Sequence, residues 1–201
     1  MGRYVVGVSG ASGVVLAMHL LRTLTNEGHK VELIFTKHAL YVAALEIGKD
    51  YAHAEQFLSY VKRKELITLY SNQDIGAAVA SGSFLTDGMI IIPCSMTTIA
   101  AITCGLGDNL LRRAADVTLK EKRSLILVPR ESPLSEIHLK NMLILSRRGA
   151  TIIPPVPAWY IQAKTIEDIE KFIVGRVLDI LRIEHNLYLK WKSKDVNSNT
   201  M

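Results

Sequence analysis

Short apolar runs recur along this chain, and most are followed by a segment whose apolar positions repeat at helical spacing. The apolar runs predict strands at Tyr4–Val8, Val31–Thr36, Leu66–Tyr70, Gly88–Pro93, Ser124–Val128 and Ala150–Ile153. Helices are predicted between them, from Val15 to Gly28, from Lys37 to Ile47, after Cys94 through Ala101, from a cap at Asp108 or Asn109 to about Arg123, from Ser135 to Arg148, and from a cap at Thr165 to about Ile183.

Strands that alternate with helices predict a parallel sheet with helices on both faces. We therefore expect an α/β fold, a flavodoxin-like or Rossmann-like three-layer sandwich with a mostly parallel sheet. The chain shows no internal repeat and no linker-like segment. Residues 1–192 are thus expected to form a single domain, with residues 193–201 as a flexible tail.

Composition agrees with a globular protein, because hydrophobic residues make up 49% and charged residues 21% of the 201 residues. The formal net charge of +5 comes largely from residues 112–123 and from the tail around Lys190, Lys192 and Lys194. No stripe of aromatic residues interleaves with these cations. The pattern therefore disfavours nucleic-acid binding.

The two cysteines bear on metal binding and location. Cys94 and Cys104 lack a second Cys or His at ligand spacing, so we expect no zinc site and two reduced thiols of a cytoplasmic protein. No apolar run approaches the ~20 residues needed to span a bilayer. The first residues are expected to form a strand and not a signal peptide.

Polar side chains gather where predicted strands end. Ser9-Gly10-Ala11-Ser12-Gly13 follows the first strand, Thr36 ends the second, and Ser95 follows the buried strand at Gly88–Pro93. The carboxyl ends of parallel strands share one rim, where open α/β folds bind ligands. Hydroxyl groups beside helix N-termini suit a ligand such as a flavin with one phosphate. Simple tight turns and helix caps are the alternative interpretation.

The segment from Arg112 to Arg123 is predicted to be a basic helix. Arg113 and Lys120 are seven residues apart and share a face with Asp116, and the next strand ends in Arg130 and Glu131. Cations that converge on one crevice favour a phosphorylated substrate or cofactor. The alternative is a solvated helix with a ladder of ion pairs.

Three further residues are candidates with a plain structural alternative. Glu46 lies among apolar neighbours late in a helix, where a carboxyl group can shuttle protons, although it can equally be a surface residue. Tyr160 follows the stiff Pro154–Pro157 loop, and Arg176 lies on the last helix; both can also serve packing and solvation. No Asp-rich cluster offers ligands for a magnesium-diphosphate mechanism.

Taken in order, these segments resemble those of UbiX-type flavin prenyltransferases, members of a superfamily of flavin-binding homo-oligomeric decarboxylase-like proteins. The matching segments are Ser9–Gly13, Glu46, Ala80–Ser83, Pro93–Thr98, Arg113–Val117 with Lys120 and Glu121, Val128–Glu131 and Pro157–Tyr160. The resemblance extends to about Trp191. It implies a flavodoxin-like enzyme that forms a homo-oligomer, typically a dodecamer, with active sites at subunit interfaces.

The resemblance also implies the reaction and its residues. In that family, dimethylallyl monophosphate alkylates reduced FMN without a metal, and a UbiD-type decarboxylase uses the prenylated FMN. By motif, FMN would be held by Gly10, Ala11, Ser12, Thr36, Ser95, Met96, Thr97, Thr98 and Arg130. The prenyl phosphate would be bound by Arg113, Lys120, Glu131, Tyr160 and Arg176. Glu46 and Ser12 would relay protons, and Lys120 would stabilise the leaving phosphate.

The sequence departs from the family pattern at a few positions, and other readings stay open. Thr36 stands where a Ser is common, Thr97 replaces a common Lys or Gly, and residues 14–17 lack a frequent Tyr. An FMN-dependent cysteine decarboxylase of the same superfamily is one alternative, although its Pro-Ala-Ser-Ala-Asn turn reads Pro93-Cys94-Ser95-Met96-Thr97 here. A non-catalytic flavin carrier is another.

Overall fold

A parallel sheet forms the centre of the molecule in the computed structural model, which describes residues 1–191. Within these residues the sheet has six strands, all parallel, in the order β3-β2-β1-β4-β5-β6. They are β1 (Arg3–Val8), β2 (Lys30–Phe35), β3 (Ile67–Ser71), β4 (Gly88–Cys94), β5 (Ser124–Pro129) and β6 (Thr151–Ile152). The parallel sheet is confirmed, and its order is that of the Rossmann fold. The expected tail at residues 193–201, with Lys192 and Lys194, lies outside the described residues.

Helices connect the strands as the apolar pattern predicts. They are α1 (Val15–Asn26), α2 (Lys37–Glu46), α3 (Gln56–Ser59), α4 (Met96–Thr103), α5 (Leu110–Lys120), α6 (Glu136–Arg147) and α7 (Ile166–Ile180), with short 3-10 helices at Lys49–Ala52, Lys64–Leu66, Ala78–Ala80 and Trp159–Ile161. Asn109, Ser135 and Thr165 each accept a hydrogen bond from a backbone amide of the first turn of α5, α6 and α7. These side chains therefore set where the three helices begin.

Several helix and strand ends differ from the prediction. α5 ends at Lys120 and not at Arg123, because Lys122 takes a left-handed backbone conformation at φ 55°. α7 ends at Ile180 and not near Ile183, with Arg182 at φ 57°. α4 continues beyond Ala101 to Thr103, and β6 shortens to two residues at the sheet edge. Helix ends depend on single backbone angles, which apolar periodicity does not report.

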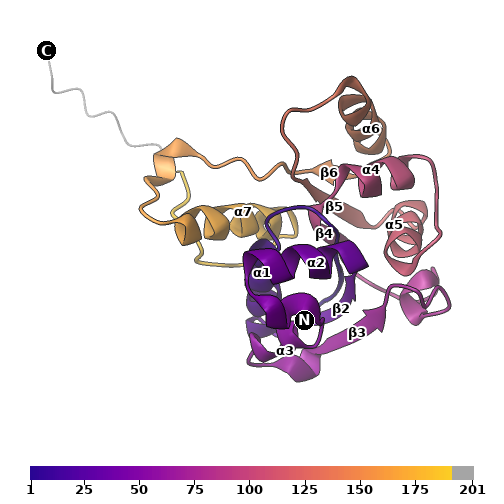
Figure 1. Ribbon diagram of the computed structural model, residues 1–201, viewed down its shortest axis with the longest axis horizontal. Coiled ribbons are helices and arrows are strands. Elements are labelled where there is room, and N and C mark those ends of the chain that lie inside the picture. Colours follow the sequence, from indigo (N-terminus) through magenta and orange to yellow (C-terminus); the bar gives the residue numbers. More distant parts are fainter. Residues whose placement is uncertain (192–201) are drawn as a thin grey trace, which may run out of the picture.

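Helices lie on both faces of the sheet (Figure 1), and each face packs into a core of its own. Side chains of Val6 and Val8 point to the face covered by α1, α2, α3 and α7, whereas Val5 points to the face covered by α4, α5 and α6. This alternation is the period of a strand, and every residue of β4 is buried because helices cover both sides. The three layers of the prediction are therefore present.

Two further properties concern the surface of α6 and the length and polarity of the helices. α6 buries only Leu145, while Leu139 and Leu143, which are one turn apart on the same side of the helix, are 53% and 51% exposed. These two leucines give α6 an exposed apolar strip. Over residues 1–191, the helices are too short or too polar for any of them to cross a lipid bilayer.

Candidate active site at the strand ends

The centre of the sheet brings two strand ends together at the point where the strand order reverses. β1 and β4 are neighbours there, and their following loops lead to α1 and α4 on opposite faces. Open α/β sheets bind ligands in the crevice at such a reversal. The buried hydroxyl of Ser9 joins the two ends, since it accepts from the Ser95 amide at 2.7 Å and donates to the Pro93 carbonyl at 3.1 Å.

One cavity of about 370 Å³ opens on the side of β1 that faces β2. The residues that line it are mostly of polar type and come from the ends of β1, β2, β3 and β4 together with the start of α5: Gly10, Thr36, Lys37, His38, Asn72, Ser95, Thr97, Thr98, Asn109 and Arg112. A Cβ atom on Gly10 would lie 2.5 Å from the Cβ of His38, so glycine permits this close approach. The guanidinium of Arg112 is held by Asp108 at 2.8 Å.

A second cavity of about 440 Å³ lies beside the first and shares Gly10, Ser95 and Thr97 with it. It extends over α4 to the loop after β5 and to α6, and it is lined by Gly10, Ala11, Ser95, Met96, Thr97, Ala100, Arg130, Glu131, Ile137, His138 and Asn141. The two cavities together contain every FMN-binding candidate from the sequence except Ser12. Tertiary structure thus brings residues from distant segments to one rim.

The hydroxyl candidates at this rim also cap helices. Thr36 accepts from the Ala39 amide at 3.1 Å at the start of α2, and Ser95 accepts from the Thr98 amide at 3.2 Å at the start of α4. The side chain of Thr98 lies 3.0 Å from that of Ser95. In these caps, each hydroxyl oxygen accepts a hydrogen bond from a backbone amide. The hydroxyl proton of Thr36 is available to donate to a ligand.

Glu46 and Ser12 line a third cavity of about 470 Å³, with Gly13, Val15, Ile47 and Glu170. The Glu46 carboxylate accepts hydrogen bonds from the amides of Gly13 and Val14, each at 3.0 Å. α1 lacks a capping side chain of its own, so a carboxylate from the end of α2 binds its free amides. The structure therefore places Glu46 beside Ser12, although they are far apart in sequence.

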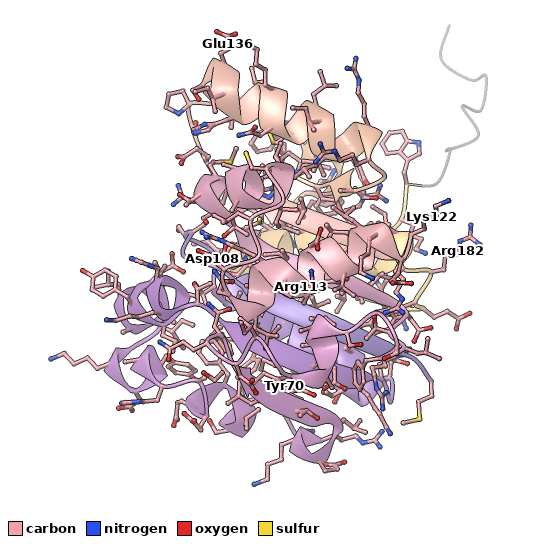
Figure 2. The ribbon with its side chains drawn as sticks, turned by 90° about the vertical axis from the view of Figure 1, so that its right-hand side faces the viewer. Tyr70, Asp108, Arg113, Lys122, Glu136 and Arg182 are labelled. Atoms are coloured by element: carbon pink, nitrogen blue, oxygen red, sulfur yellow. The ribbon has the colours of Figure 1, made fainter. Side chains whose placement is uncertain are left out.

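The basic helix holds its cations in ion pairs. Arg113 Nη1 lies 3.0 Å from Asp116, and Lys120 Nζ lies 2.6 Å from Glu121. The pKa of Glu121 is lowered, chiefly by its hydrogen bond with Lys120. Lys120 is at the C-terminal end of α5, against Gly82, whereas Asp108 and the strand-end cavity are at the other end; Figure 2 shows Asp108 and Lys122 at these opposite ends.

Tyr160 and Arg176 lie on the other side of the sheet. Tyr160 packs edge-to-face on Phe172 of α7 with ring centroids 6.2 Å apart, and Arg176 pairs with Asp179 at 2.9 Å one turn further along that helix. Since α5 belongs to one core and α7 to the other, the sheet separates Tyr160 and Arg176 from Lys120. One chain therefore does not bring the phosphate-binding candidates into one crevice: two lie on α5, two lie at α7, and Glu131 lines the second strand-end cavity.

The sequence prediction assigned no ligand-binding role to several residues of the rim. His38, Asn72 and Arg112 line the first cavity, and Ser9 connects the two strands beneath both cavities. Position is the feature that could have identified three of them, since Ser9, His38 and Asn72 each lie within three residues of a strand end. Arg112 borders the cavity because α5 begins two residues earlier.

A buried thiol lies at this rim. Burial raises the pKa of the Cys94 thiol far above its ordinary value, so Cys94 stays protonated beneath the site. Cys104, at the end of α4, is exposed.

Comparison with known proteins identifies the class to which this fold and site belong. The profile of the Flavoprotein family matches residues 2–178. The flavin prenyltransferase UbiX of Chlamydia pneumoniae is 48% identical over 198 residues, which cover 97% of this chain and 100% of that protein.

Two solved structures are similar over nearly the whole chain. The crystal structure of AnUbiX (PadA1) in complex with FMN and dimethylallyl pyrophosphate has 42% identity and a TM-score of 0.89, covering 96% of this chain and 99% of that one. A dodecameric FMN-dependent UbiX-like decarboxylase from Escherichia coli O157:H7 has 42% identity and a TM-score of 0.86, covering 94% and 99%. The chain belongs to the Flavoprotein family, within its UbiX-type flavin prenyltransferases.

Proposed function

We propose that this chain is a flavin prenyltransferase that transfers a dimethylallyl group from dimethylallyl monophosphate to reduced FMN. The observation that carries the proposal is the pair of adjoining strand-end cavities, which are lined by all but one of the residues assigned to FMN by resemblance. Relatives that bear this activity in their names, and the AnUbiX structure with FMN and dimethylallyl pyrophosphate, support it.

The residues present fit FMN. The absence of a side chain at Gly10 leaves the loop after β1 close to His38, so backbone lines the point where the two cavities meet. Hydroxyl groups of Thr36 and Ser95 offer hydrogen bonds to a polar ring system, while Arg112 and Arg130 offer positive charge to a phosphate. When bound there, reduced FMN would supply the nucleophilic ring atoms that accept the prenyl group.

Glu46 and Ser12 are proposed to hold and move protons. Two backbone amides fix the Glu46 carboxylate, and Ser12 shares its cavity. A positioned carboxylate can take a proton released during bond formation, and a serine hydroxyl can pass it on. The assignment uses a contact that the tertiary structure creates between the end of α2 and the start of α1.

The leaving phosphate is proposed to meet residues from two copies of the chain. Arg113 and Lys120 lie on α5, Glu131 lies after β5, and Tyr160 and Arg176 lie near α7 across the sheet. In an oligomer, Tyr160 and Arg176 of one copy would complete a site with Arg113 and Lys120 of another copy. The exposed Leu139 and Leu143 of α6 and the dodecameric UbiX-like neighbour support assembly into a homo-oligomer, which we propose to be a dodecamer.

The test is anaerobic incubation of the purified protein with reduced FMN and dimethylallyl monophosphate, followed by mass spectrometry of the released flavin. A mass gain of one prenyl unit is expected, and a reaction without the prenyl donor is the control. Bound but unmodified FMN would overturn the proposal and favour a flavin carrier. Release of CO2 from a cysteine-containing substrate would favour the cysteine decarboxylase.

We further propose that a UbiD-type decarboxylase receives the prenylated FMN and that the reaction takes place in the cytoplasm. Two unpaired cysteines, one of them exposed, suit a reducing compartment. Activation of an inactive apo-decarboxylase of that type by the released product, and not by FMN, would test the transfer.

A further inference from the structure

Residues 181–191 fold back along α7, and Asp179 gathers the contacts that hold them. Its carboxylate accepts hydrogen bonds from the Tyr188 hydroxyl and from His185 Nε2 at 3.2 Å, and Lys190 Nζ lies 3.3 Å away. The same carboxylate pairs with Arg176 Nη1 at 2.9 Å. We call residues 181–191 the C-terminal clasp. One acid thus links the clasp to the arginine assigned to the prenyl phosphate.

A glycine makes this arrangement possible. A Cβ atom on Gly175 would lie 2.5 Å from Tyr188 Cδ1 and 2.9 Å from His185 Cε1, so both rings rest directly on the helix backbone. The side chain of Tyr188 also packs edge-to-face on Phe172, with centroids 4.9 Å apart. Gly175 is a weak helix former, and its place within α7 therefore agrees with a packing requirement for the clasp.

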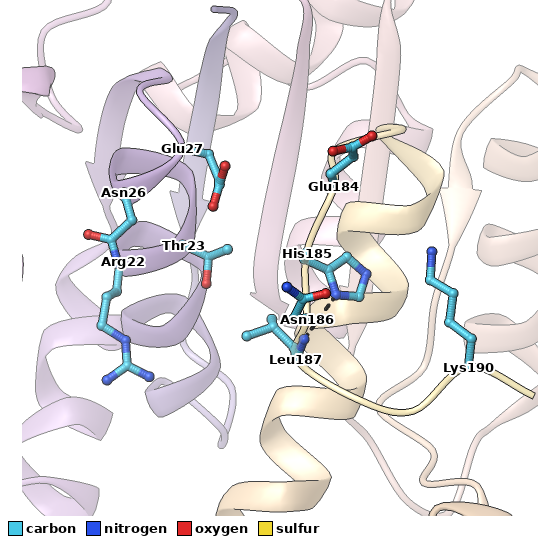
Figure 3. Close-up of a pocket in the computed structure, with 9 residues that line it drawn as sticks. All are labelled: Arg22, Thr23, Asn26, Glu27, Glu184, His185, Asn186, Leu187 and Lys190. Carbon is cyan, nitrogen blue, oxygen red and sulfur yellow. Dashed lines mark hydrogen bonds between the residues drawn. The ribbon is translucent and has the colours of Figure 1, made fainter.

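The clasp also reaches Tyr160. Its last described residue, Trp191, packs edge-to-face on Tyr160 with centroids 5.1 Å apart. The opposite side of the clasp is open, because a cavity of about 730 Å³ lies between residues 184–190 and the end of α1 (Figure 3). The clasp is therefore held by its contacts with α7, with Tyr160 and, through Ile183 and Leu187, with the hydrophobic core. Among these contacts, the polar ones of Asp179 also reach Arg176.

We propose that Asp179 is a positioning residue for the prenyl-phosphate site, through Arg176 directly and through Tyr160 by way of the clasp. This inference rests on the proposed function, which assigns these two residues to the phosphate. Arg176 is about half exposed at its side chain and gives one nitrogen to Asp179, so its other N–H groups can bind a phosphate. A guanidinium that is already fixed loses less conformational entropy when the phosphate binds.

The charge balance of the cluster agrees with this role. Burial by itself would raise the pKa of Asp179, but hydrogen bonds from Tyr188, Lys190 and His185 bring the pKa below its ordinary value. Asp179 therefore stays ionised, and the pKa of Arg176 is raised by Tyr188 and Asp179. Because Lys190 adds a second cation, the acid does not leave the cluster with a net negative charge that would repel a phosphate.

The test is Asp179→Asn in the full-length protein, with dissociation constants for dimethylallyl monophosphate and for FMN. With FMN bound, the constant for the monophosphate should rise about tenfold, the effect of losing a hydrogen bond to a charged group. The constant for FMN should stay within about twofold, since Asp179 lines neither strand-end cavity. Hydrogen exchange of residues 181–191 should accelerate in the same variant, a readout that needs no turnover.

Glu167→Gln is the matched control, because Glu167 is an exposed acid on the same helix and pairs with Lys171 at 2.9 Å. It should change neither constant. If Asp179→Asn does not fold, Tyr188→Phe removes one bond to the same carboxylate and should show the same pattern at smaller size. An unchanged constant for the monophosphate would overturn this inference, whereas failure of the wild-type protein to prenylate FMN would overturn the proposed function alone.

Discussion

The hydroxyl of Ser9 accepts a hydrogen bond from the Ser95 amide at 2.7 Å and so ties the end of β1 to the end of β4. The same hydroxyl donates to the Pro93 carbonyl at 3.1 Å, and Ser9 is fully buried. This side chain therefore fixes the separation of two loops whose other residues line both strand-end cavities. Position at the reversal of strand order makes a small buried serine important for the site.

Ser9→Ala should destabilise the protein by about 1–3 kcal/mol, because it leaves the partly buried Ser95 amide without its acceptor, while the Pro93 carbonyl keeps the bond from the Ser9 amide. FMN affinity should fall as well, since the Ser95 loop is no longer held. Urea denaturation and flavin titration would measure the two effects. Ser81→Ala, at an exposed serine outside the strand-end cavities, is the control. Unchanged FMN affinity in Ser9→Ala would show that the loops keep their separation without the hydroxyl.

Glu46→Gln should keep the fold and bind FMN, because the amide oxygen of glutamine can still accept from the Gly13 and Val14 amides. Turnover should fall by about 10²–10⁴-fold, the usual contribution of a general acid or base, with the reaction halted after the first of its two bonds. Rapid-quench mass spectrometry and flavin absorbance would follow it. Glu46→Ala should additionally lose about 1 kcal/mol of stability with the helix cap. Full turnover by Glu46→Gln would end the assignment of Glu46 to proton transfer.

Lys120→Ala and Arg176→Ala should each abolish most activity, and co-expressed together they should restore part of it. The two side chains lie on opposite sides of the sheet, so a site that uses both would take them from different copies. Random mixing of the two variants then gives roughly a quarter of sites with both residues intact. Assays of tagged, co-purified mixtures would show this. No recovery in mixed oligomers would mean that one chain supplies both residues.

Stability should decline in alkali as Tyr70 ionises. Burial, and then the neighbouring Glu32 carboxylate, raise the pKa of Tyr70 from 10.0 to about 12, against the opposing effect of Arg3. A raised folded-state pKa means that the contribution is complete below pH 10 and is lost between pH 10 and about 12. Denaturation at a series of pH values would measure the slope, which should be smaller in Tyr70→Phe. An identical slope in that variant would show that other tyrosines dominate.

Much of the fold followed from local pattern, whereas the grouping of the site residues did not. The apolar runs that became β1, β2, β4 and β5 each contain enough apolar residues to be buried on both faces, so their identity as strands depended little on context. The ends of α5 and α7 were misplaced, because each depends on one residue with positive φ, Lys122 or Arg182. Such a backbone angle leaves little trace in the spacing of apolar side chains.

The amino-acid sequence by itself determined the alternation of strands and helices, the cap at Thr165, the choice of Asp108 or Asn109 as the cap of α5, and the presence of polar residues after strands, since these are local consequences of side-chain chemistry. Only the tertiary structure decided which of those residues meet. Strand order put the loops after β1 and β4 side by side, the packing of α2 carried Glu46 to the amides of α1, and the sheet separated Lys120 from Arg176. Distances between segments remote in sequence depend on strand pairing and core packing, which no local pattern encodes.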